Sequence, residues 1–251
     1  MGSHEGGTAL VIGGASGIGA ALVERYKSHQ IPVTVWDVDG HYDIRCDIAD
    51  PVQIEEALQQ TIRRCGLPGP VTITAGIGHS GLLADMSTDE WDRVMQINTR
   101  GPWLCLRAVA NVLMGAGQSG SLVGTSSVSA HLIDRSMGAY CASKAALSML
   151  VKVAAAEWGP QGIRVNAVAP GVTMTPMLGR ATAESPWLTA VAGRTALGRL
   201  GEAADIARTI RALHDMDWVT GQIIDCDGGL SLHSPINAYG HALEQRRGPT
   251  P

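Results

Sequence analysis

The 251-residue chain contains no phenylalanine, and aromatic residues together make up only 4% of it. Leucine, isoleucine, valine, alanine and methionine must therefore fill the core. Charged residues are also few, at 17%, and the formal net charge is −4. Lysine and arginine form no cluster larger than an isolated pair such as Arg246 and Arg247. This charge pattern gives no support to a nucleic-acid partner.

The chain has five cysteines, an odd number, and none of them stands in CxxC spacing. Disulfides and zinc are therefore not expected, and no residue is assigned as a metal ligand. No apolar run approaches the roughly 18 residues that a membrane span needs, so no membrane partner is expected. The N-terminus, MGSHEGG, lacks the basic and apolar regions of a signal peptide. A cytoplasmic location is expected, with residues 1–7 as a flexible N-terminus.

What the chain does have is 45% hydrophobic residues and 31 glycines, in a length that suits one large domain. Strands are expected over Thr8–Ile12, Pro32–Trp36, Val71–Ala75, Ser121–Thr125, Gly162–Val168 and Gln222–Asp225. Helices are expected after the glycines at 13–19 and over Pro51–Cys65, Thr88–Met114, Ala139–Trp158 and Glu202–His214. This alternation predicts one α/β domain over residues 1–251, a Rossmann-type doubly wound parallel sheet with helices on both faces.

A glycine motif follows the first predicted strand, with Gly13, Gly17 and Gly19 in the spacing GxxxGxG. Glycines in such a turn let the backbone approach a pyrophosphate, which then lies over the N-terminus of the next helix. An ordinary glycine-rich turn between a strand and a helix is the alternative interpretation.

Asp37 ends the second predicted strand, about 20 residues beyond the glycine motif. A carboxylate there can accept hydrogen bonds from the ribose hydroxyls of an adenosine and would repel a 2′-phosphate. No lysine or arginine lies in the glycine loop or directly after Asp37. These features favour NAD over NADP. The alternative is a plain surface turn, since WDVDG is also a turn sequence.

Tyr140 and Lys144 are four residues apart in a predicted helix, which places both on one face. A tyrosine has an ordinary pKa near ~10, and a lysine ammonium beside it would lower that pKa toward neutrality. Ser127 follows a predicted strand at the same edge of the sheet. Asn98 lies within a predicted helix, where asparagine is unfavourable. The alternatives are an exposed Tyr140–Lys144 pair and a solvent-facing Asn98.

Taken together, these features resemble the short-chain dehydrogenase/reductase family. Its motifs correspond here, in order, to GGASGIG, Asp37, CDIAD, TAGIG, INT, SSVSA, YCASK, VNAVAPGVTMT and GQIIDCDGG. The resemblance implies a catalytic set of Asn98, Ser127, Tyr140 and Lys144. It implies cofactor contacts at Gly13, Ser16, Gly17, Ile18, Gly19, Asp37, Val38, Asp47, Ile48, Thr74, Ala75, Gly76, Tyr140, Lys144, Pro170, Gly171, Thr173 and Thr175.

Two residues depart from the family pattern. Ile12 stands where a threonine is usual, and Thr74 stands where the family has an asparagine. Both positions normally support the backbone between the first and fourth strands. The departures therefore put local hydrogen bonding in doubt, but not catalysis.

The resemblance implies an NAD-dependent oxidoreductase that interconverts a hydrophobic secondary alcohol and its ketone, with Tyr140 as general acid/base. Hydroxysteroid and alicyclic alcohol dehydrogenases are the most similar members, so a steroid, terpenoid or alicyclic substrate is expected. The alternatives are a 3-oxoacyl-thioester reductase, which usually uses NADPH, and a catalytically silent NAD-sensing protein. A homotetramer is expected from the family, and Leu147, Leu150 and Val151 are interpreted as outer helix positions compatible with it.

Residues 172–195 show no firm periodicity and are expected to form a substrate lid. Residues 231–251 are expected to form a C-terminal tail. Candidate walls of the substrate pocket are His79, His131, Leu132, Met137, Met174, Met177, Leu178 and Trp187. Their apolar balance favours a hydrophobic substrate. The two histidines are isolated loop residues and are not expected to act as catalysts.

Overall fold

In the computed structural model, which describes residues 7–179 and 185–232, the apolar runs form one parallel sheet. Its seven strands stand in the order β3-β2-β1-β4-β5-β6-β9. The strands are β1 (Ala9–Ile12), β2 (Val33–Asp37), β3 (Ile44–Arg45), β4 (Pro70–Ile73), β5 (Gly120–Thr125), β6 (Ile163–Pro170) and β9 (Ile223–Cys226). The strand order reverses between β1 and β4. Doubly wound sheets bind their ligands at the carboxyl ends of the strands beside such a reversal.

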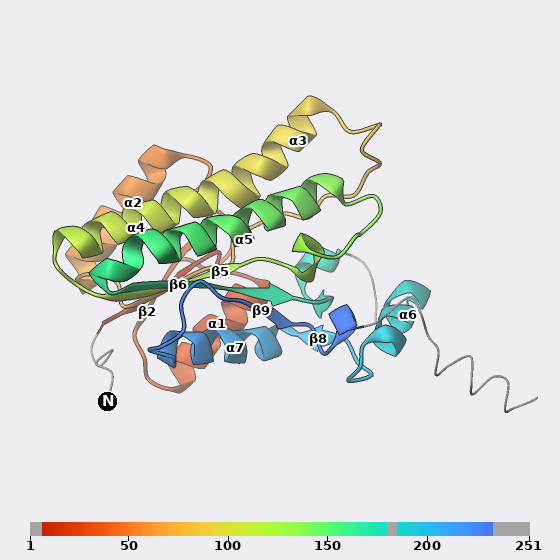
Figure 1. Ribbon diagram of the computed structural model, residues 1–251. Helices are drawn as coiled ribbons and strands as arrows, with labels where there is room; N and C mark the ends of the chain where they lie inside the picture. Colours follow the sequence, from red (N-terminus) through yellow and green to blue (C-terminus); the bar gives the residue numbers. More distant parts are fainter. Residues whose placement is uncertain (1–6, 180–184, 233–251) are drawn as a thin grey trace, which may run out of the picture.

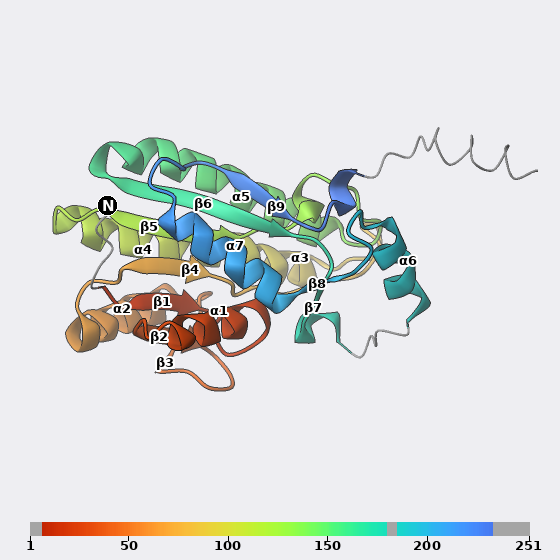
Figure 2. The same ribbon diagram turned by 90° about the horizontal axis from the view of Figure 1, so that it is seen from below.

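Helices cover both faces of the sheet (Figures 1 and 2). One face carries α2 (Pro51–Cys65), α4 (Gly101–Gly115) and α5 (Gly138–Trp158). The other carries α1 (Gly17–Ser28) and α7 (Ala203–Asp215), which pack against each other. The predicted fold class, one Rossmann-type domain with helices on both faces of a parallel sheet, is confirmed.

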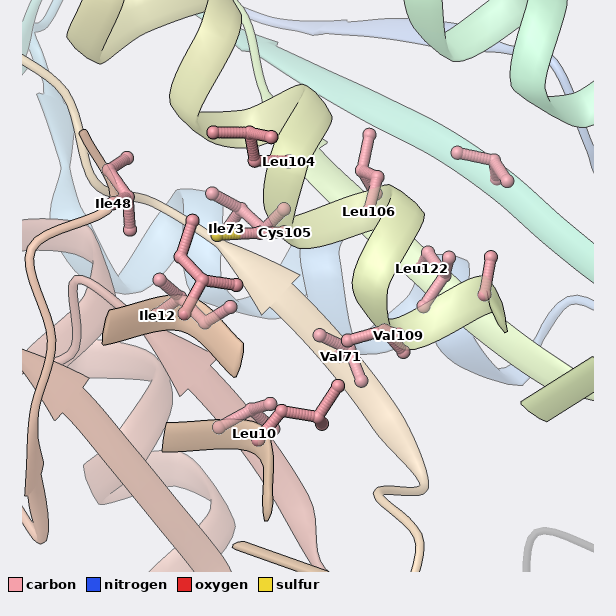
Figure 3. Close-up of a cluster of buried hydrophobic side chains, with 14 of the residues drawn as sticks. Leu10, Ile12, Ile48, Val71, Ile73, Leu104, Cys105, Leu106, Val109 and Leu122 are labelled. Atoms are coloured by element: carbon pink, nitrogen blue, oxygen red, sulfur yellow. The ribbon is translucent and has the colours of Figure 1, made fainter. Parts of the chain in front are cut away.

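The core is aliphatic, as the scarcity of aromatic residues requires. Every residue of β1, β4 and β5 is buried, which is typical of parallel strands covered on both faces. Figure 3 shows part of the cluster beneath α4. Its labelled members are Leu10, Ile12, Ile48, Val71, Ile73, Leu104, Cys105, Leu106, Val109 and Leu122. A second cluster lies under α1 and α7 and includes Val11, Leu22, Ile206 and Ile210.

The predicted helix over Thr88–Met114 is wrong in one respect, because a π turn divides it. It consists of α3 (Thr88–Met95), a π turn over Gln96–Arg100, and α4. Pro102 explains the break, since it has no N–H to donate to the carbonyl of Asn98 four residues earlier. The sequence also predicts Thr88 as the N-cap of this helix, and the structure differs. Ser87, not Thr88, accepts the backbone N–H of Glu90 and completes a capping box with it.

The segment after β6 has more structure than its sequence suggested. It contains β7 (Thr173–Met174), which pairs with β8 (Gly201–Glu202), and the helix α6 (Pro186–Arg194). Of these short elements, β7 and α6 lie within residues 172–195, and the interpretation of that segment as a substrate lid stays a prediction. Leu188 is the buried residue of α6, and a single buried position gives too weak a periodicity to detect. Residues 180–184, the N-terminus over 1–6 and the tail from 233 lie outside the described residues.

Among the residues that the structure describes, one helix is long and apolar enough to span a membrane. The segment Gly138–Gln161 has a mean hydropathy of 1.2, contrary to the sequence-based expectation that no stretch would be apolar enough. This segment is α5 and the turn after it. Because α5 packs on β6 and buries Leu147 and Val151 at the core, we interpret it as a core helix.

Candidate active site

A cavity of about 500 Å³ lies where the strand order reverses, at the carboxyl ends of β1, β2 and β4. Most of the residues predicted to contact a cofactor line it. They are Gly13, Ser16, Gly17, Ile18, Gly19, Asp37, Val38, Asp47, Ile48, Thr74, Ala75, Gly76 and Thr175. The structure therefore brings together residues from the glycine loop, the end of β2, the segment after β3 and the loop after β4.

The glycine loop is packed too tightly for side chains. A Cβ on Gly13 would lie 2.4 Å from the backbone nitrogen of Ala75, and the φ of Gly13 is +87°. A Cβ on Gly19 would lie 2.1 Å from the carbonyl oxygen of Gly13. Glycine is thus required at both positions, since the loop contacts the chain after β4 and the first turn of α1. The arrangement brings the N-terminus of α1, with its favourable field for an anion, to the cavity wall.

Thr74 braces the two central strands despite the departure from the family pattern. Its hydroxyl donates to the carbonyl of Gly13 over 2.8 Å and lies 3.2 Å from the carbonyl of Ile12. The hydrogen bonding that the sequence put in doubt is therefore present, and it comes from a threonine in place of the usual asparagine.

Asp37 stands at the cavity and also fixes the loop beside it. One carboxylate oxygen accepts the backbone N–H of Ala15 over 2.9 Å, and the other accepts that of Val38 over 2.8 Å. The turn interpretation and the cofactor interpretation of Asp37 are thus compatible. The carboxylate ties the glycine loop to β2 and presents negative charge to the cavity that both elements line.

Several residues that line the cavity were not predicted from the sequence as cofactor contacts. They are Ile12, Asp39, Arg45, Cys46, Ile77, Arg93, Ile97, Pro176 and Met177. The spacing of Arg93 and Ile97 was available from the sequence, whereas Arg45 is identified by the register of two strands. Arg45 lies opposite Asp37 in the register of β2 and β3, and it alternates with the predicted Asp47. Arg93 and Ile97 are four residues apart, a spacing that places both on one side of a helix.

Asn98 is fully buried, so its interpretation as a solvent-facing residue is wrong. Its side-chain oxygen accepts the backbone N–H of Ile77 over 2.8 Å, and its amide donates to the carbonyl of Ile77 over 2.8 Å. The amide also lies 3.2 Å from the hydroxyl of Ser143 on α5. Asn98 therefore ties the loop after β4 to α5, from a position set by the π turn.

Lys144 lies beside Asn98, behind the cavity wall. A Cβ on Gly76, which lines the cavity, would be 3.3 Å from the Lys144 Nζ and 3.2 Å from the Asn98 side-chain oxygen. The ammonium is buried and donates to the carbonyl of Thr125 over 2.9 Å. Burial lowers the pKa of Lys144 from 10.5 to about 8.

Tyr140 is half-buried on the same helix, with its ring centroid 5.7 Å from the Lys144 Nζ. Burial raises the pKa of Tyr140 above its ordinary 10.0, and hydrogen bonding with the Ser127 side chain opposes that rise. The predicted lowering of this pKa by Lys144 is therefore wrong for the protein alone. The physical reason is that burial of the phenol outweighs the ammonium, which is directed to the carbonyl of Thr125.

Ser127 is 7% exposed and lies directly after β5. Its oxygen accepts the backbone N–H of Ser129 over 3.1 Å. The preceding Ser126 donates to the carbonyl of Lys144 over 3.1 Å, which fastens the end of β5 to α5. The four predicted catalytic residues thus come from the loop after β5, from α5 and from the π turn, and meet at one edge of the sheet.

The family model described as an enoyl-(acyl carrier protein) reductase matches residues 13–231. The chain belongs to the short-chain dehydrogenase/reductase family. A (3R)-3-hydroxyacyl-CoA dehydrogenase of Canis lupus familiaris is 32% identical over 250 residues, covering 89% of this chain and 96% of that protein. A 2,5-dichloro-2,5-cyclohexadiene-1,4-diol dehydrogenase of Sphingobium indicum is 33% identical over 251 residues, covering 92% and 99%.

The structure also resembles a solved dehydrogenase. The aldohexose dehydrogenase of Thermoplasma acidophilum, in ligand-free form, superposes with a TM-score of 0.84 at 27% identity, covering 92% of this chain and 96% of that one. This short-chain dehydrogenase/reductase is accordingly an oxidoreductase that acts on alcohol substrates with a nicotinamide cofactor.

Five predicted cofactor residues of this short-chain dehydrogenase/reductase lie outside the cavity lining, namely Tyr140, Lys144, Pro170, Gly171 and Thr173. Pro170 ends β6 beside β9, and the Thr173 hydroxyl donates to the carbonyl of Gly171 over 2.9 Å. Of the four cofactor contacts predicted at and after the end of β6, Thr175 lines the cavity. Its side chain would lie 3.5 Å from a Cβ on Gly17.

The predicted substrate-pocket walls are not gathered into one cavity in the described residues. Met177 alone of that set lines the cavity above. The histidines face acids instead: the Nε2 of His79 lies 3.6 Å from Glu90, and the Nε2 of His131 lies 3.1 Å from Asp225. These pairs join loops to neighbouring elements, so neither histidine is assigned a chemical role.

Proposed function

We propose that this short-chain dehydrogenase/reductase interconverts a hydrophobic secondary alcohol and its ketone and prefers NAD to NADP. The observation that carries the cofactor preference is the Asp37 carboxylate, which lines the cavity at the end of β2. A ribose diol can donate hydrogen bonds to this carboxylate, whereas a 2′-phosphate would meet its negative charge. Arg45 lines the same cavity and would reduce that repulsion. We therefore expect NADP to be used less efficiently than NAD, but not to be excluded.

The residues present fit a dinucleotide. The glycine loop and the N-terminus of α1 would hold the pyrophosphate, Asp37 the adenosine ribose, and Asp47 with Ile48 the adenine. Lys144 would hold the hydroxyls of the other ribose. When bound, the nicotinamide would accept a hydride from the carbinol carbon during oxidation and donate one to it during reduction.

In this mechanism the protein moves one proton at the substrate oxygen. The Tyr140 oxygen takes the hydroxyl proton during oxidation and returns it during reduction. The Ser127 oxygen already accepts the Ser129 N–H, which leaves its own proton to donate to the substrate oxygen. The Lys144 ammonium, whose Nζ lies 5.7 Å from the Tyr140 ring centroid, would favour the phenolate and so oppose the effect of burial. Acid/base assistance of this kind contributes roughly 10²–10⁴ to the rate.

The apolar character of the substrate, of steroid, terpenoid or alicyclic type, rests on side chains around the carboxyl edge. Met174, Met177 and Trp187 are 37%, 54% and 53% exposed on the segments after β6. Of the three, Met177 lines the cavity, and an exposed apolar side chain at a site favours an apolar ligand.

We further propose a cytoplasmic homotetramer that associates through the outer surfaces of α4 and α5. Leu147 and Val151 do not support this, because both are buried against the sheet, contrary to their interpretation as outer positions. Support comes from Trp103 and Met149, which are 37% and 59% exposed on these two helices, and from Leu150.

The second candidate is a 3-oxoacyl-thioester reductase. It is favoured by the canine relative, whose name specifies a hydroxyacyl thioester, and by the description of the family model. A catalytically silent NAD-sensing protein is the least supported alternative, because Ser127, Tyr140 and Lys144 are all present.

The test is a set of initial rates with NAD and NADP on secondary alcohols of graded size, on an aldohexose and on a 3-hydroxyacyl thioester. We expect kcat/KM to be at least about tenfold higher with NAD and to rise with the apolar area of the alcohol. A tenfold preference for NADP would contradict the role of Asp37. Turnover of the thioester alone would favour the second candidate.

A further inference from the structure

The loop between Ser127 and Tyr140 contains an acid that the mechanism above does not use. Asp134 lies at the middle of this loop, and its carboxylate accepts the hydroxyl of Ser129 over 2.5 Å. Its backbone carbonyl accepts the N–H of Met137 over 3.1 Å, one residue before α5 begins. Asp134 therefore contacts the Ser127 end of the loop through its side chain and the Tyr140 end through its backbone.

The contact with Ser129 bears directly on Ser127. Ser129 is 7% exposed, and its backbone N–H donates to the Ser127 oxygen over 3.1 Å. Because that N–H occupies a lone pair of the oxygen, it determines where the Ser127 proton can point. A hydrogen bond to a carboxylate is stronger than one to a neutral acceptor, so Asp134 holds Ser129 more firmly than an amide would.

The titratable groups around Tyr140 lie on its own helix and on the loop before it. Lys144 and Cys141 lie on its own helix, and Asp134 lies on the preceding loop, where its charge contributes to the raised pKa of Tyr140. His131, on the same loop, is directed to Asp225 at the end of β9.

We propose that Asp134 is a positioning residue, whose carboxylate orients the Ser127 hydroxyl through Ser129 and whose charge acts on Tyr140 from the loop before its helix. The proposal rests on the proposed function only in that Ser127 serves the reacting oxygen. Because Asp134 acts through Ser129, the effects of replacing the two residues should not add.

The kinetic test compares Asp134→Ala, Ser129→Ala and the double variant on the best alcohol found. We expect each single variant to lower kcat by about tenfold with little change in KM or in NAD affinity, and the double variant to be no worse. Asp134→Asn keeps an acceptor and should recover part of the rate. Glu56→Gln, which removes an exposed carboxylate from α2, is the matched control and should leave kcat unchanged. Additive losses, or equal losses in kcat and NAD affinity, would overturn the proposal.

A second measurement does not depend on turnover. The ionisation of Tyr140 can be followed as the phenolate absorbance of the protein minus that of its Tyr140→Phe variant. Asp134→Asn should lower the midpoint by on the order of half a pH unit, and Glu56→Gln should not move it. An unchanged midpoint in Asp134→Asn would refute the placement of its charge. If no alcohol is turned over, the proposed function fails while this titration still tests Asp134.

Discussion

Replacing Asn98 with alanine tests whether the π turn stabilises the fold by placing the Asn98 side chain against the backbone of Ile77. The substitution removes both hydrogen bonds to the backbone of Ile77 and the contact with Ser143. A buried donor or acceptor without a partner costs about 1–3 kcal/mol. Ile77 is half-buried, so the cost of leaving its N–H or its carbonyl without a partner lies near the lower end of that range. Alanine recovers about 0.5 kcal/mol in helix propensity, which leaves a net loss of about 2 kcal/mol.

This loss is measurable by urea unfolding or by calorimetry. For a chain of this size it corresponds to a fall in Tm of roughly 4–8 °C. Asn111→Ala is the matched control, because Asn111 lies on α4, is exposed and makes no side-chain hydrogen bond in the described residues. It should change the free energy of unfolding by no more than about 0.5 kcal/mol.

Asn98→Asp separates the two hydrogen bonds. The carboxylate can still accept the Ile77 N–H, but its second oxygen faces the Ile77 carbonyl and cannot donate to it. Its free energy of unfolding should therefore fall at least as far as that of Asn98→Ala. If Asn98→Ala and Asn111→Ala gave the same stability, the account of the π turn would be refuted.

Two further predictions concern the cofactor loop and the buried lysine. Gly19→Ala should abolish NAD binding in calorimetric titration and cost about 1–3 kcal/mol, because its Cβ would meet the carbonyl of Gly13 at 2.1 Å. Gly115→Ala, where nothing lies within 4 Å, should bind NAD normally, and NAD binding by Gly19→Ala would contradict the packing. The pKa of Lys144 is about 8 in the folded protein and 10.5 in the unfolded chain. Between these two pH values the unfolded chain binds more protons, so the free energy of unfolding rises with pH. Urea unfolding of the cofactor-free protein near pH 7.5 and pH 10 should show a gain on the order of 3 kcal/mol that Lys144→Met lacks, and an equal gain in both would count against the buried charge.

The positions of most strands and of the cofactor loop were predictable because each rests on local patterns. Apolar runs such as Thr8–Ile12 are too short for helices, and the glycines and Asp37 recur at the ends of consecutive strands. The cap at Asp50 was also predictable, since its carboxylate accepts the N–H of Val52 and Pro51 begins the helix. In all these cases the decisive interaction lies within a few residues of the sequence.

The properties that were missed depend on distant partners. The inward position of Asn98 is determined by the backbone of Ile77, and no propensity of asparagine encodes that contact. The pKa of Tyr140 depends on how deeply the fold buries it, which the four-residue spacing to Lys144 does not reveal. Arg45 became visible only once the register of β2 and β3 placed it opposite Asp37.

The central claim is that Tyr140 is the acid/base of an NAD-dependent alcohol dehydrogenase. The most direct measurement is the turnover of Tyr140→Phe with the best alcohol, together with its affinity for NAD by calorimetry. The account predicts that kcat falls by at least about 10², while NAD binds within a few-fold of the unaltered protein. Retained turnover in Tyr140→Phe would contradict the assignment, whatever its affinity for NAD.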